Sequence, residues 1–204
     1  MKGKVAGVFL AGGRSSRMGG GDKCLKRLGD QTLLSRAIER TKDQVGPMVL
    51  NANGDPTRFS SYGLPVAADV ISDFPGPLAG VLTGLEWAAR YAPECEYVAT
   101  FASDTPFIPR SLVQKLYKLI ELGAILACAT SNRRHHPVFG LWPVRERSRL
   151  RETMLVDNTR KVDVWTARYK LGIVDFSTKP IDPFFNINTP EDLAYAEDFL
   201  ARMR

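Results

Sequence analysis

At 204 residues, with 44% hydrophobic and 25% charged residues, the chain has the composition of a globular protein that forms a full core as one domain. Its net charge of +6 favours anionic partners, but acids are interspersed with the basic residues from 145 to 168 without stacking aromatics, so we expect no nucleic acid among them. No apolar stretch approaches the ~20 residues of a membrane span and no C-x-x-C motif joins the cysteines, which favours a cytoplasmic protein without a membrane contact, a disulfide framework or a zinc site.

The first predicted element is a buried strand, Val5 to Leu10, which runs directly into a loop rich in glycine and basic residues. Arg17 offers a planar fork to phosphate oxygens and Lys23 a compact point charge, so the two suit different parts of one triphosphate. Glycines without a Cβ let backbone N–H groups turn toward a ligand at close approach, and the loop has five: Gly12, Gly13, Gly19, Gly20 and Gly21. The loop therefore predicts polyphosphate binding.

Two familiar phosphate loops do not match this segment. The P-loop motif G-x-x-x-x-G-K-[ST] requires a hydroxyl after its lysine, but Cys24 follows Lys23. The dinucleotide motif requires a helix directly after its glycines, whereas helical periodicity resumes only near Thr32. A tight connection that binds nothing remains an alternative, which the two cations inside the loop disfavour.

Helices and strands then alternate as far as residue 122. The apolar patterns predict a helix from about 33, strands over 48–51 and 66–68, a turn over 73–77, a helix over 78–89, a strand over 97–102 and a helix over 111–122. Such alternation predicts an α/β protein whose mostly parallel sheet has helices on both faces. Ligands of these sheets bind beyond the carboxyl ends of the strands, where Leu10, Asn51, Asp69 and Asp104 fall.

The second half is less regular. We expect strands over 124–129 and 138–142 joined by a polar link over 133–136, a largely helical stretch over 145–168 and a short strand over 173–175. A closing helix over 190–202 has Thr189 as its N-cap and Pro190 at its first position. On the polar link, we expect Arg133 and Arg134 to be solvated, although they would also suit an anionic phosphate, and we expect His135 and His136 to be either solvated or packed within the loop.

Nucleotidyl transfer would need oxygen ligands for a divalent cation that neutralises the phosphates, and one or two carboxylates commonly provide them. Asp104 follows the strand over 97–102, which makes it the candidate metal ligand. A turn or helix cap explains the sequence Ser103-Asp104-Thr105-Pro106 as well, because aspartate and proline are ordinary turn residues.

Ordered sequence blocks resemble the nucleotidyltransferases that join a nucleoside monophosphate to a phosphorylated acceptor. The first block is L-A-G-G-x-S-x-R-M-G-x-x-x-K, from Leu10 to Lys23. The similarity to the molybdenum cofactor guanylyltransferase (MobA) family is greater still, through V-L-N-A-N at 49–53, D-F-P-G-P-L-A-G at 73–80, S-D-T-P at 103–106, H-P at 136–137 and N-I-N-T-P-E-D-L at 186–193. Because the blocks keep their order over nearly the whole chain, the resemblance implies a three-layer, Rossmann-like nucleotidyltransferase fold.

The resemblance also implies a reaction and its residues. GMP would pass from GTP to the molybdopterin cofactor with release of pyrophosphate and with Mg²⁺ as the metal. Asp104 would hold Mg²⁺, and Arg17 and Lys23 would act with it in catalysis. Asn186 and Asn188 would lie near the pterin, although relatives that use sugar phosphates carry an acidic metal ligand in this late block. The expected GTP contacts are Leu10, Ala11, Gly12, Gly13, Lys23, Asn51, Asp69 and Asp104.

Three alternatives stay open at this point: a cytidylyltransferase, a sugar- or polyol-phosphate nucleotidyltransferase, and a nucleotide-binding regulator without turnover. Within the favoured reading, residues 1–204 form one domain whose amino-terminal half binds the nucleotide and whose carboxyl-terminal half binds the acceptor. Besides its two substrates, we expect the protein to make transient contacts with cofactor-biosynthesis proteins or molybdoenzymes.

Overall fold

The computed structural model describes residues 2–12, 21–72 and 76–203. Several sequence predictions lie outside these ranges, and they concern Gly13, Arg17, Gly19, Gly20 and the turn residues 73–75. The remaining predictions are compared with the structure below.

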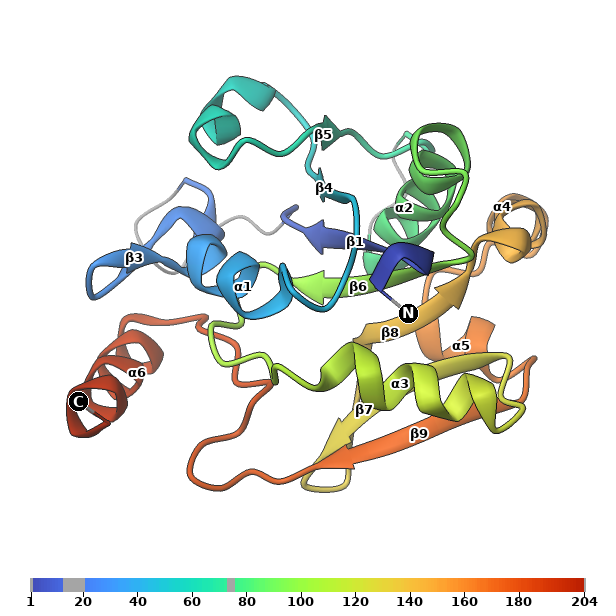
Figure 1. Cartoon of the computed structure of the whole chain (residues 1–204). Helices are drawn as coiled ribbons and strands as arrows, with labels where there is room; N and C mark the ends of the chain where they lie inside the picture. The colour runs from blue at the N-terminus through green and yellow to red at the C-terminus, as the bar shows by residue number, and fades with distance from the viewer. Residues whose placement is uncertain (1, 13–20, 73–75, 204) are drawn as a thin grey trace.

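Within the described residues, a seven-stranded sheet forms the centre of the molecule in the order β5-β4-β1-β6-β8-β7-β9 (Figure 1). Neighbouring strands among β5, β4, β1 and β6 pair in parallel, as do β7 and β9, whereas β8 is antiparallel to both of its neighbours. The strands are β1 (Val5–Leu10), β4 (Met48–Asn51), β5 (Val66–Ala67), β6 (Tyr97–Ala102), β7 (Leu126–Ser131), β8 (Arg134–Pro143) and β9 (Leu171–Phe176). The predicted α/β fold with a mostly parallel sheet is confirmed.

Helices cover both faces of this sheet (Figure 1). Apolar residues of α1 (Leu33–Thr41) and α3 (Leu112–Glu121) share one core cluster with β1 and β6. Residues of α2 (Pro77–Tyr91), α4 (Arg147–Val156) and α5 (Val162–Thr166) share a second cluster on the opposite face. Side chains of a strand point alternately to the two faces of the sheet. In β1, Val5 and Phe9 belong to the first cluster and Ala6 and Val8 to the second, so the sheet is the middle one of three layers.

A third cluster lies beside the carboxyl ends of the strands. There α6 (Pro190–Arg202) packs near a short hairpin of β2 (Arg27–Leu28) and β3 (Gln31–Thr32), with Leu28, Ile187 and Ala196 buried between them. Short 3₁₀ helices complete the chain: η1 (Lys2–Lys4), η3 (Lys23–Leu25), η4 (Pro56–Tyr62) and η5 (Val144–Glu146). This cluster places the segments 23–28 and 186–196 at one edge of the sheet.

Close packing of α2 requires glycine at the point where the helix crosses β1 and β4. A Cβ on Gly80 would lie 2.6 Å from Leu10 Cδ2 and nearer still to Asn51 Oδ1, and one on Gly84 would lie 2.5 Å from Val8 Cγ2. These distances are shorter than nonbonded carbon atoms tolerate, so only glycine lets the helix approach. The helix is thereby held directly against the ends of β1 and β4.

The prediction of a polar link over residues 133–136 is wrong. β8 begins at Arg134, and a two-residue turn of Asn132 and Arg133 joins it to β7. Both turn residues have positive φ, 46° and 61°, as tight hairpins require. The polar sequence reads as a loop because the exposed end of the hairpin needs no apolar residues.

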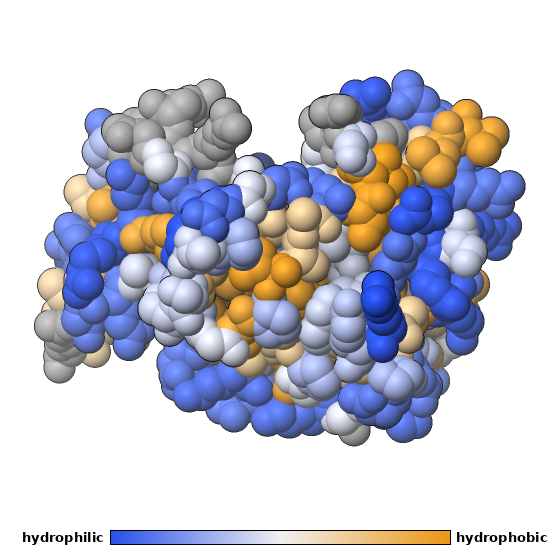
Figure 2. All heavy atoms as spheres, turned by 90° about the horizontal axis from the view of Figure 1, so that it is seen from above, coloured by the Kyte–Doolittle hydropathy of each residue, from blue (hydrophilic) through white to orange (hydrophobic). Residues whose placement is uncertain are grey.

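Seen from above, which in Figure 1 is the side of β5, apolar side chains gather in the middle of the surface and hydrophilic ones surround them (Figure 2). Among the described residues, no helix combines the length and the apolar character that a crossing of a membrane requires.

Candidate active site

The predicted site residues gather at the carboxyl edge of the parallel strands. β1 ends at Leu10, β4 ends at Asn51, and Asp104 follows β6 by two residues. Hydrogen bonds tie these ends together, because Ala11 N donates to Asn51 O at 2.9 Å and Ser103 Oγ donates to Leu10 O at 2.8 Å. The expected convergence at this edge is therefore present for every predicted residue that the structure describes there.

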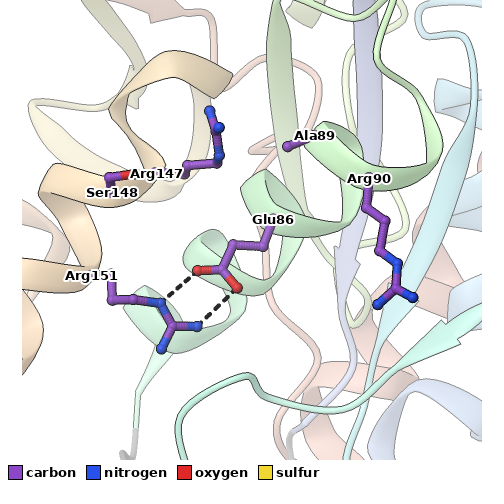
Figure 3. A pocket seen from close by; sticks show the side chains of 6 residues that line it. All are labelled: Glu86, Ala89, Arg90, Arg147, Ser148 and Arg151. Atoms are coloured by element: carbon purple, nitrogen blue, oxygen red, sulfur yellow. Dashed lines mark hydrogen bonds and ion pairs between the residues drawn. The ribbon is translucent and has the colours of Figure 1, made fainter.

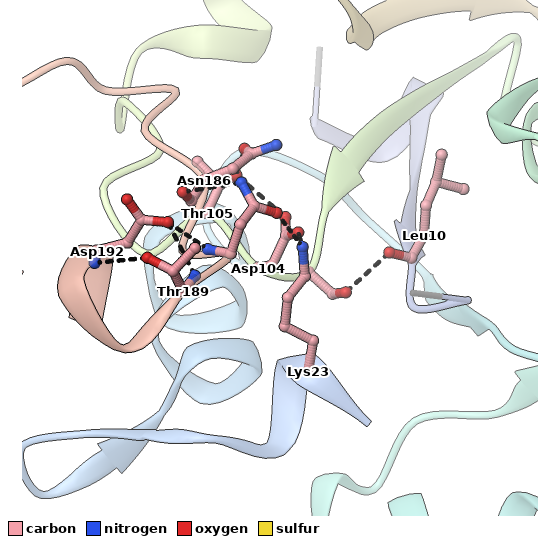
Figure 4. Close-up of polar contacts among 9 residues, drawn as sticks. Leu10, Lys23, Asp104, Thr105, Asn186, Thr189 and Asp192 are labelled. Atoms are coloured by element: carbon pink, nitrogen blue, oxygen red, sulfur yellow. Dashed lines mark hydrogen bonds and ion pairs between the residues drawn. The ribbon is translucent and has the colours of Figure 1, made fainter. Parts of the chain in front are cut away.

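Lys23 joins two segments that are far apart in the sequence. Its Nζ forms an ion pair with Asp104 Oδ2 and donates a hydrogen bond of 2.6 Å to Asn188 Oδ1 (Figure 4). The side chains of Lys23 and Asp104 are each only 14% exposed, so the pair is much less screened by water than a surface ion pair. The cluster combines a cation, a carboxylate and an amide oxygen in one place.

The segment that carries Asn186 and Asn188 is fixed from both sides. Thr105 Oγ1 donates to Asn186 Oδ1 at 2.6 Å, next to Asp104. At the start of α6, Asp192 Oδ2 accepts from the backbone N–H groups of Asn188 and Thr189 at 2.8 and 2.9 Å, and Thr189 Oγ1 accepts from Asp192 N. This capping box confirms the predicted N-cap and holds Asn188 beside Lys23.

A second polar group lies at the ends of β4 and β5. Asn51 Nδ2 donates to Asp69 Oδ1 at 2.8 Å, and Asn53 Nδ2 donates to Asp69 Oδ2 at 2.7 Å. Asn53 Oδ1 accepts in turn from Asp69 N at 2.8 Å. The structure thus brings Asn51 and Asp69 together, and it adds Asn53, which stands on the same side of the extended chain two residues after Asn51 and could have been found by that spacing.

Cys24 directly follows Lys23 but has no reactive character. Its side chain is buried, and desolvation raises the pKa of this thiol to about 12, partly opposed by a hydrogen bond with Ser103. The thiol is therefore protonated at neutral pH and packs in the core. The three cysteines, Cys24, Cys95 and Cys128, are all free, as the sequence predicts.

The site offers few ligands to a metal ion. Within the described part of the chain, no three histidine, cysteine, aspartate or glutamate side chains cluster in a way that would hold a metal by themselves. Asp104 nevertheless presents a carboxylate to a cation, the Lys23 amine, with amide oxygens nearby. One carboxylate with substrate phosphates and water is a common magnesium site, so these residues fit such an ion when a nucleotide is bound.

A cavity of about 270 Å³ opens beside Asn186 and Asn188. Its other walls include Arg134, His136, Asp182 and Phe184. Of the two states expected for His136, solvated or packed, the structure shows the packed one, because the ring is half-buried and lies against Phe184 with centroids 4.6 Å apart. Asp182 and Phe184 carry no periodic signal in the sequence and were missed. Because Asn186 and Asn188 are expected from the sequence to lie near the acceptor, we call this space the acceptor-side cavity.

A second cavity, of about 380 Å³, lies between α2 and α4 and contains none of the predicted site residues (Figure 3). Its acid is already paired, because Glu86 accepts two hydrogen bonds from Arg151 at 2.7 and 2.8 Å. Arg90 and Arg147 also line it.

Comparison with known proteins agrees with this geometry. The family model described as the MobA-like NTP transferase domain matches residues 7–170. A molybdenum cofactor guanylyltransferase of Nitrobacter hamburgensis is 51% identical over 196 residues, which cover 96% of this chain and 94% of that protein. A protein of the same name from Mesorhizobium japonicum is 45% identical over 207 residues and covers 100% of this chain and 99% of its own length.

Solved structures share the fold. The molybdopterin-guanine dinucleotide biosynthesis protein A of Archaeoglobus fulgidus superposes with a TM-score of 0.76 at 22% identity, over 97% of this chain and 100% of the other. The 4-diphosphocytidyl-2C-methyl-D-erythritolsynthase of Anaerococcus prevotii superposes with a TM-score of 0.75 at 12% identity, over 98% and 97% of the two chains. With a family match across most of its length and relatives that share about half of its residues, the chain belongs to the MobA-like NTP transferase family.

Proposed function

We propose that this enzyme is a molybdenum cofactor guanylyltransferase, which transfers GMP from GTP to the phosphate of the molybdopterin cofactor and releases pyrophosphate. Its near full-length relatives carry that name. The observation that carries the proposal is the meeting of Lys23, Asp104 and Asn188, because it joins the glycine-rich loop to the segment beside the acceptor-side cavity.

The reaction needs no nucleophile from the protein. An oxygen of the acceptor phosphate attacks the α-phosphorus of GTP, and the bond from this phosphorus to the bridging oxygen breaks as pyrophosphate leaves with the electron pair. The main obstacle is repulsion between anions, so the enzyme works chiefly by positioning the groups and neutralising charge. The buried thiol of Cys24 is consistent with this scheme, since it takes no part.

We infer that the loop after β1 holds the triphosphate, with Leu10, Ala11, Gly12 and Gly13 as its backbone cradle and Arg17 as one of its cations. Lys23 supplies the second cation. Its amine is paired with Asp104 and moves toward phosphate oxygens when the nucleotide arrives, because the phosphates carry more negative charge than one carboxylate.

We assign the guanosine contacts to Asn51 and Asp69. Their amide and carboxylate are held by hydrogen bonds to each other and to Asn53, so they are fixed before a ligand binds. Fixed polar groups lose little entropy on binding and can read a base edge or a ribose hydroxyl. This side of the sheet edge then binds the nucleotide.

Nucleotidyltransferases of this kind generally use a divalent metal ion. We infer that the metal here is Mg²⁺ and that Asp104 holds it, together with the phosphates of GTP. The ion would neutralise the α- and β-phosphates as negative charge develops on the leaving group. The placement of Asp104 against a cation supports this role.

We assign Asn186 and Asn188 to the acceptor, because the cavity that both of them line begins where Asn188 contacts Lys23. One domain would then divide its work, with the amino-terminal half binding GTP and the carboxyl-terminal half binding the cofactor. We also place the enzyme in the cytoplasm, where buried thiols such as Cys24 and Cys128 stay reduced.

The test is a pyrophosphate-release assay with Mg²⁺, molybdopterin and each of GTP, CTP, ATP and UTP. Release with GTP alone, together with formation of the guanine dinucleotide, is the expected result. Turnover with CTP in place of GTP would make the enzyme a cytidylyltransferase. Turnover with a sugar or polyol phosphate but not with molybdopterin would make it a sugar- or polyol-phosphate nucleotidyltransferase. Binding of GTP without any turnover would indicate a nucleotide-binding regulator.

A further inference from the structure

The acceptor-side cavity connects the reaction centre with the tip of the β7–β8 hairpin. At one end Asn188 contacts Lys23, and Asn186 contacts Thr105 next to Asp104. At the other end Ser131, which pairs with Arg134 across the hairpin, joins His136 to Asp182. An acceptor whose phosphate lies at the Asn188 end would therefore extend its other end toward the hairpin.

The two carboxylates in this cavity are already occupied by protein donors. Asp182 Oδ1 accepts from Ser131 Oγ and from the backbone N–H of Phe184, both at 2.9 Å. Asp192 accepts from the backbone N–H groups of Asn188 and Thr189. Among the described residues, no cation pairs with either acid, and each acid is satisfied by neutral donors that hold the walls of the cavity in place.

Arg134 is different. Across residues 2–12, 21–72 and 76–203, no hydrogen bond or ion pair engages its guanidinium group, although this group lines the cavity. A guanidinium provides five N–H donors in a planar fork that matches anionic oxygens. The cavity thus presents a cation whose donors remain available to a ligand.

His136 adds a flat surface and no second cation. Burial lowers the pKa of this histidine, with the charges of Arg134 and His135 acting in the same direction and Asp182 opposing them, so the ring is neutral at neutral pH. The hydroxyl of Ser131 donates its hydrogen bond to Asp182, so His136 Nε2, 2.7 Å from Ser131 Oγ, is the donor to Ser131. The ring is thereby held in one tautomer against Phe184.

We propose that Arg134 is a specificity-determining residue that binds a negatively charged group of the acceptor at the end remote from its reacting phosphate, while the half-buried ring of His136, held in place by the buried Phe184, packs against the flat ring system of the acceptor. This proposal rests on the proposed function, which supplies a pterin as the acceptor. Binding energy from such a remote group holds the substrate in place without entering the bond-making step.

The chain provides a matched control in the neighbouring residue. Arg133 is exposed, lies in the turn with a φ of 61° and does not line the cavity. Arg134→Gln and Arg133→Gln therefore remove the same charge one residue apart. Arg134→Lys keeps the charge but loses the planar fork.

The experiment is steady-state kinetics of pyrophosphate release, with molybdopterin and GTP varied in turn, for the wild-type protein and these three variants. Arg134→Gln should raise the KM for molybdopterin by about 10- to 100-fold, the range expected for losing a hydrogen bond to a charged group. Its kcat and its KM for GTP should stay within about twofold of wild type, because the contact to the acceptor is lost equally in the ground state and in the transition state. The KM of Arg134→Lys for molybdopterin should lie between those of wild type and Arg134→Gln, and the KM of Arg133→Gln should equal that of wild type.

Three results would overturn the proposal while leaving the proposed function intact. They are a KM of Arg134→Gln for molybdopterin equal to that of Arg133→Gln, a changed KM for GTP, and a loss confined to kcat. If the wild-type protein releases no pyrophosphate from GTP with molybdopterin, the proposed function fails and this inference fails with it.

Discussion

At the scale of single residues, the contact between Lys23 and Asp104 defines the site before substrates arrive. The Lys23 amine forms an ion pair with Asp104, the carboxylate that the proposed metal ion would need. The same amine donates a hydrogen bond to Asn188 Oδ1. In the proposed reaction, binding of a nucleotide with its metal therefore separates the pair. The cost is moderate because the phosphates offer the amine a stronger partner, so the ion pair keeps two nearly buried charges compensated until GTP replaces it.

Asp104→Asn tests this assignment. The amide keeps the size of the side chain but loses the charge, so pyrophosphate release should fall at least about 100-fold, as when a group that stabilises transition-state charge is removed. Because Lys23, only 14% exposed, then loses its paired charge, the melting temperature should fall as well, so turnover is measured at a temperature where both proteins are folded. The assay is paired with thermal unfolding, and Asp198→Asn on the exposed face of α6 is the control. Normal turnover by Asp104→Asn would contradict the metal role.

Residue patterns predicted the members of the site better than their partners. Leu10, Asn51, Asp69 and Asp104 could be placed because each follows a recognisable strand of a parallel sheet. The hydrogen bonds from Thr105 to Asn186 and from the backbone N–H of Asn188 to Asp192 could not be predicted, since they join segments about eighty residues apart or depend on loop geometry. Side chains that meet only through tertiary structure leave no local pattern.

At the scale of elements, the position of α2 depends on glycines on the face that packs against the sheet. Gly80 faces Leu10 and Asn51 at distances that leave no room for a methyl group. The helix therefore sets the position of Asn51, which is also hydrogen-bonded to Asp69. With the guanosine contact that we propose for Asn51, packing and nucleotide binding are coupled at this contact.

Gly80→Ala should consequently affect both properties. The added methyl group overpacks a filled interface, which typically costs about 1–3 kcal/mol in the free energy of unfolding. It should also weaken GTP binding by displacing Asn51. Urea unfolding and GTP titration measure the two effects. Gly3→Ala is the control, because a Cβ at Gly3 meets no atom within 4 Å and should change neither quantity.

The capping box of α6 supports a second coupled prediction. Thr189→Ala removes the hydroxyl that caps the helix and should lower the free energy of unfolding by about 0.5–2 kcal/mol. It should also raise the KM for the acceptor, because Asn188 immediately precedes the cap and is held by the same aspartate.

Thr32→Ala separates the two effects. Thr32 caps α1 in the same way, accepting from Ser35 N at 3.0 Å, so its loss should cost similar stability while the KM for the acceptor stays unchanged. Equal effects of both substitutions on KM would show that α6 does not position Asn188 in a specific manner.

Elements with strong periodicity were predicted closely, and weakly patterned ones were not. The strands Val5–Leu10, Met48–Asn51 and Tyr97–Ala102 and the helix Pro190–Arg202 have the expected bounds. The hairpin of β2 and β3 was missed because two residues per strand give no period. The helical stretch predicted over 145–168 is divided between η5, α4 and α5, with Asn158 at a φ of 50° between the two α-helices.

At the scale of the whole molecule, buried thiols lie on both faces of the sheet. Cys24 belongs to the core cluster beneath α1 and α3, and Cys128 to the cluster beneath α2 and α4. Burial raises the pKa of each thiol from its ordinary value of 9.0 to about 12. Both thiols therefore link the free energy of unfolding to pH in the same direction.

Stability should fall steeply in alkaline solution for this reason. Each folded-state pKa lies above its unfolded value, so the contribution is fully present below pH 9.0 and is lost as the pH rises toward about 12. Each thiol can remove about 1.4 kcal/mol per pH unit in that interval. Urea unfolding at a series of pH values should show a shallower decline for the Cys24→Ala/Cys128→Ala double variant than for wild type. Tyr97 and Tyr169, whose pKa values are also raised by burial, contribute equally in both proteins. Identical slopes would mean that water reaches the two thiols in the folded protein.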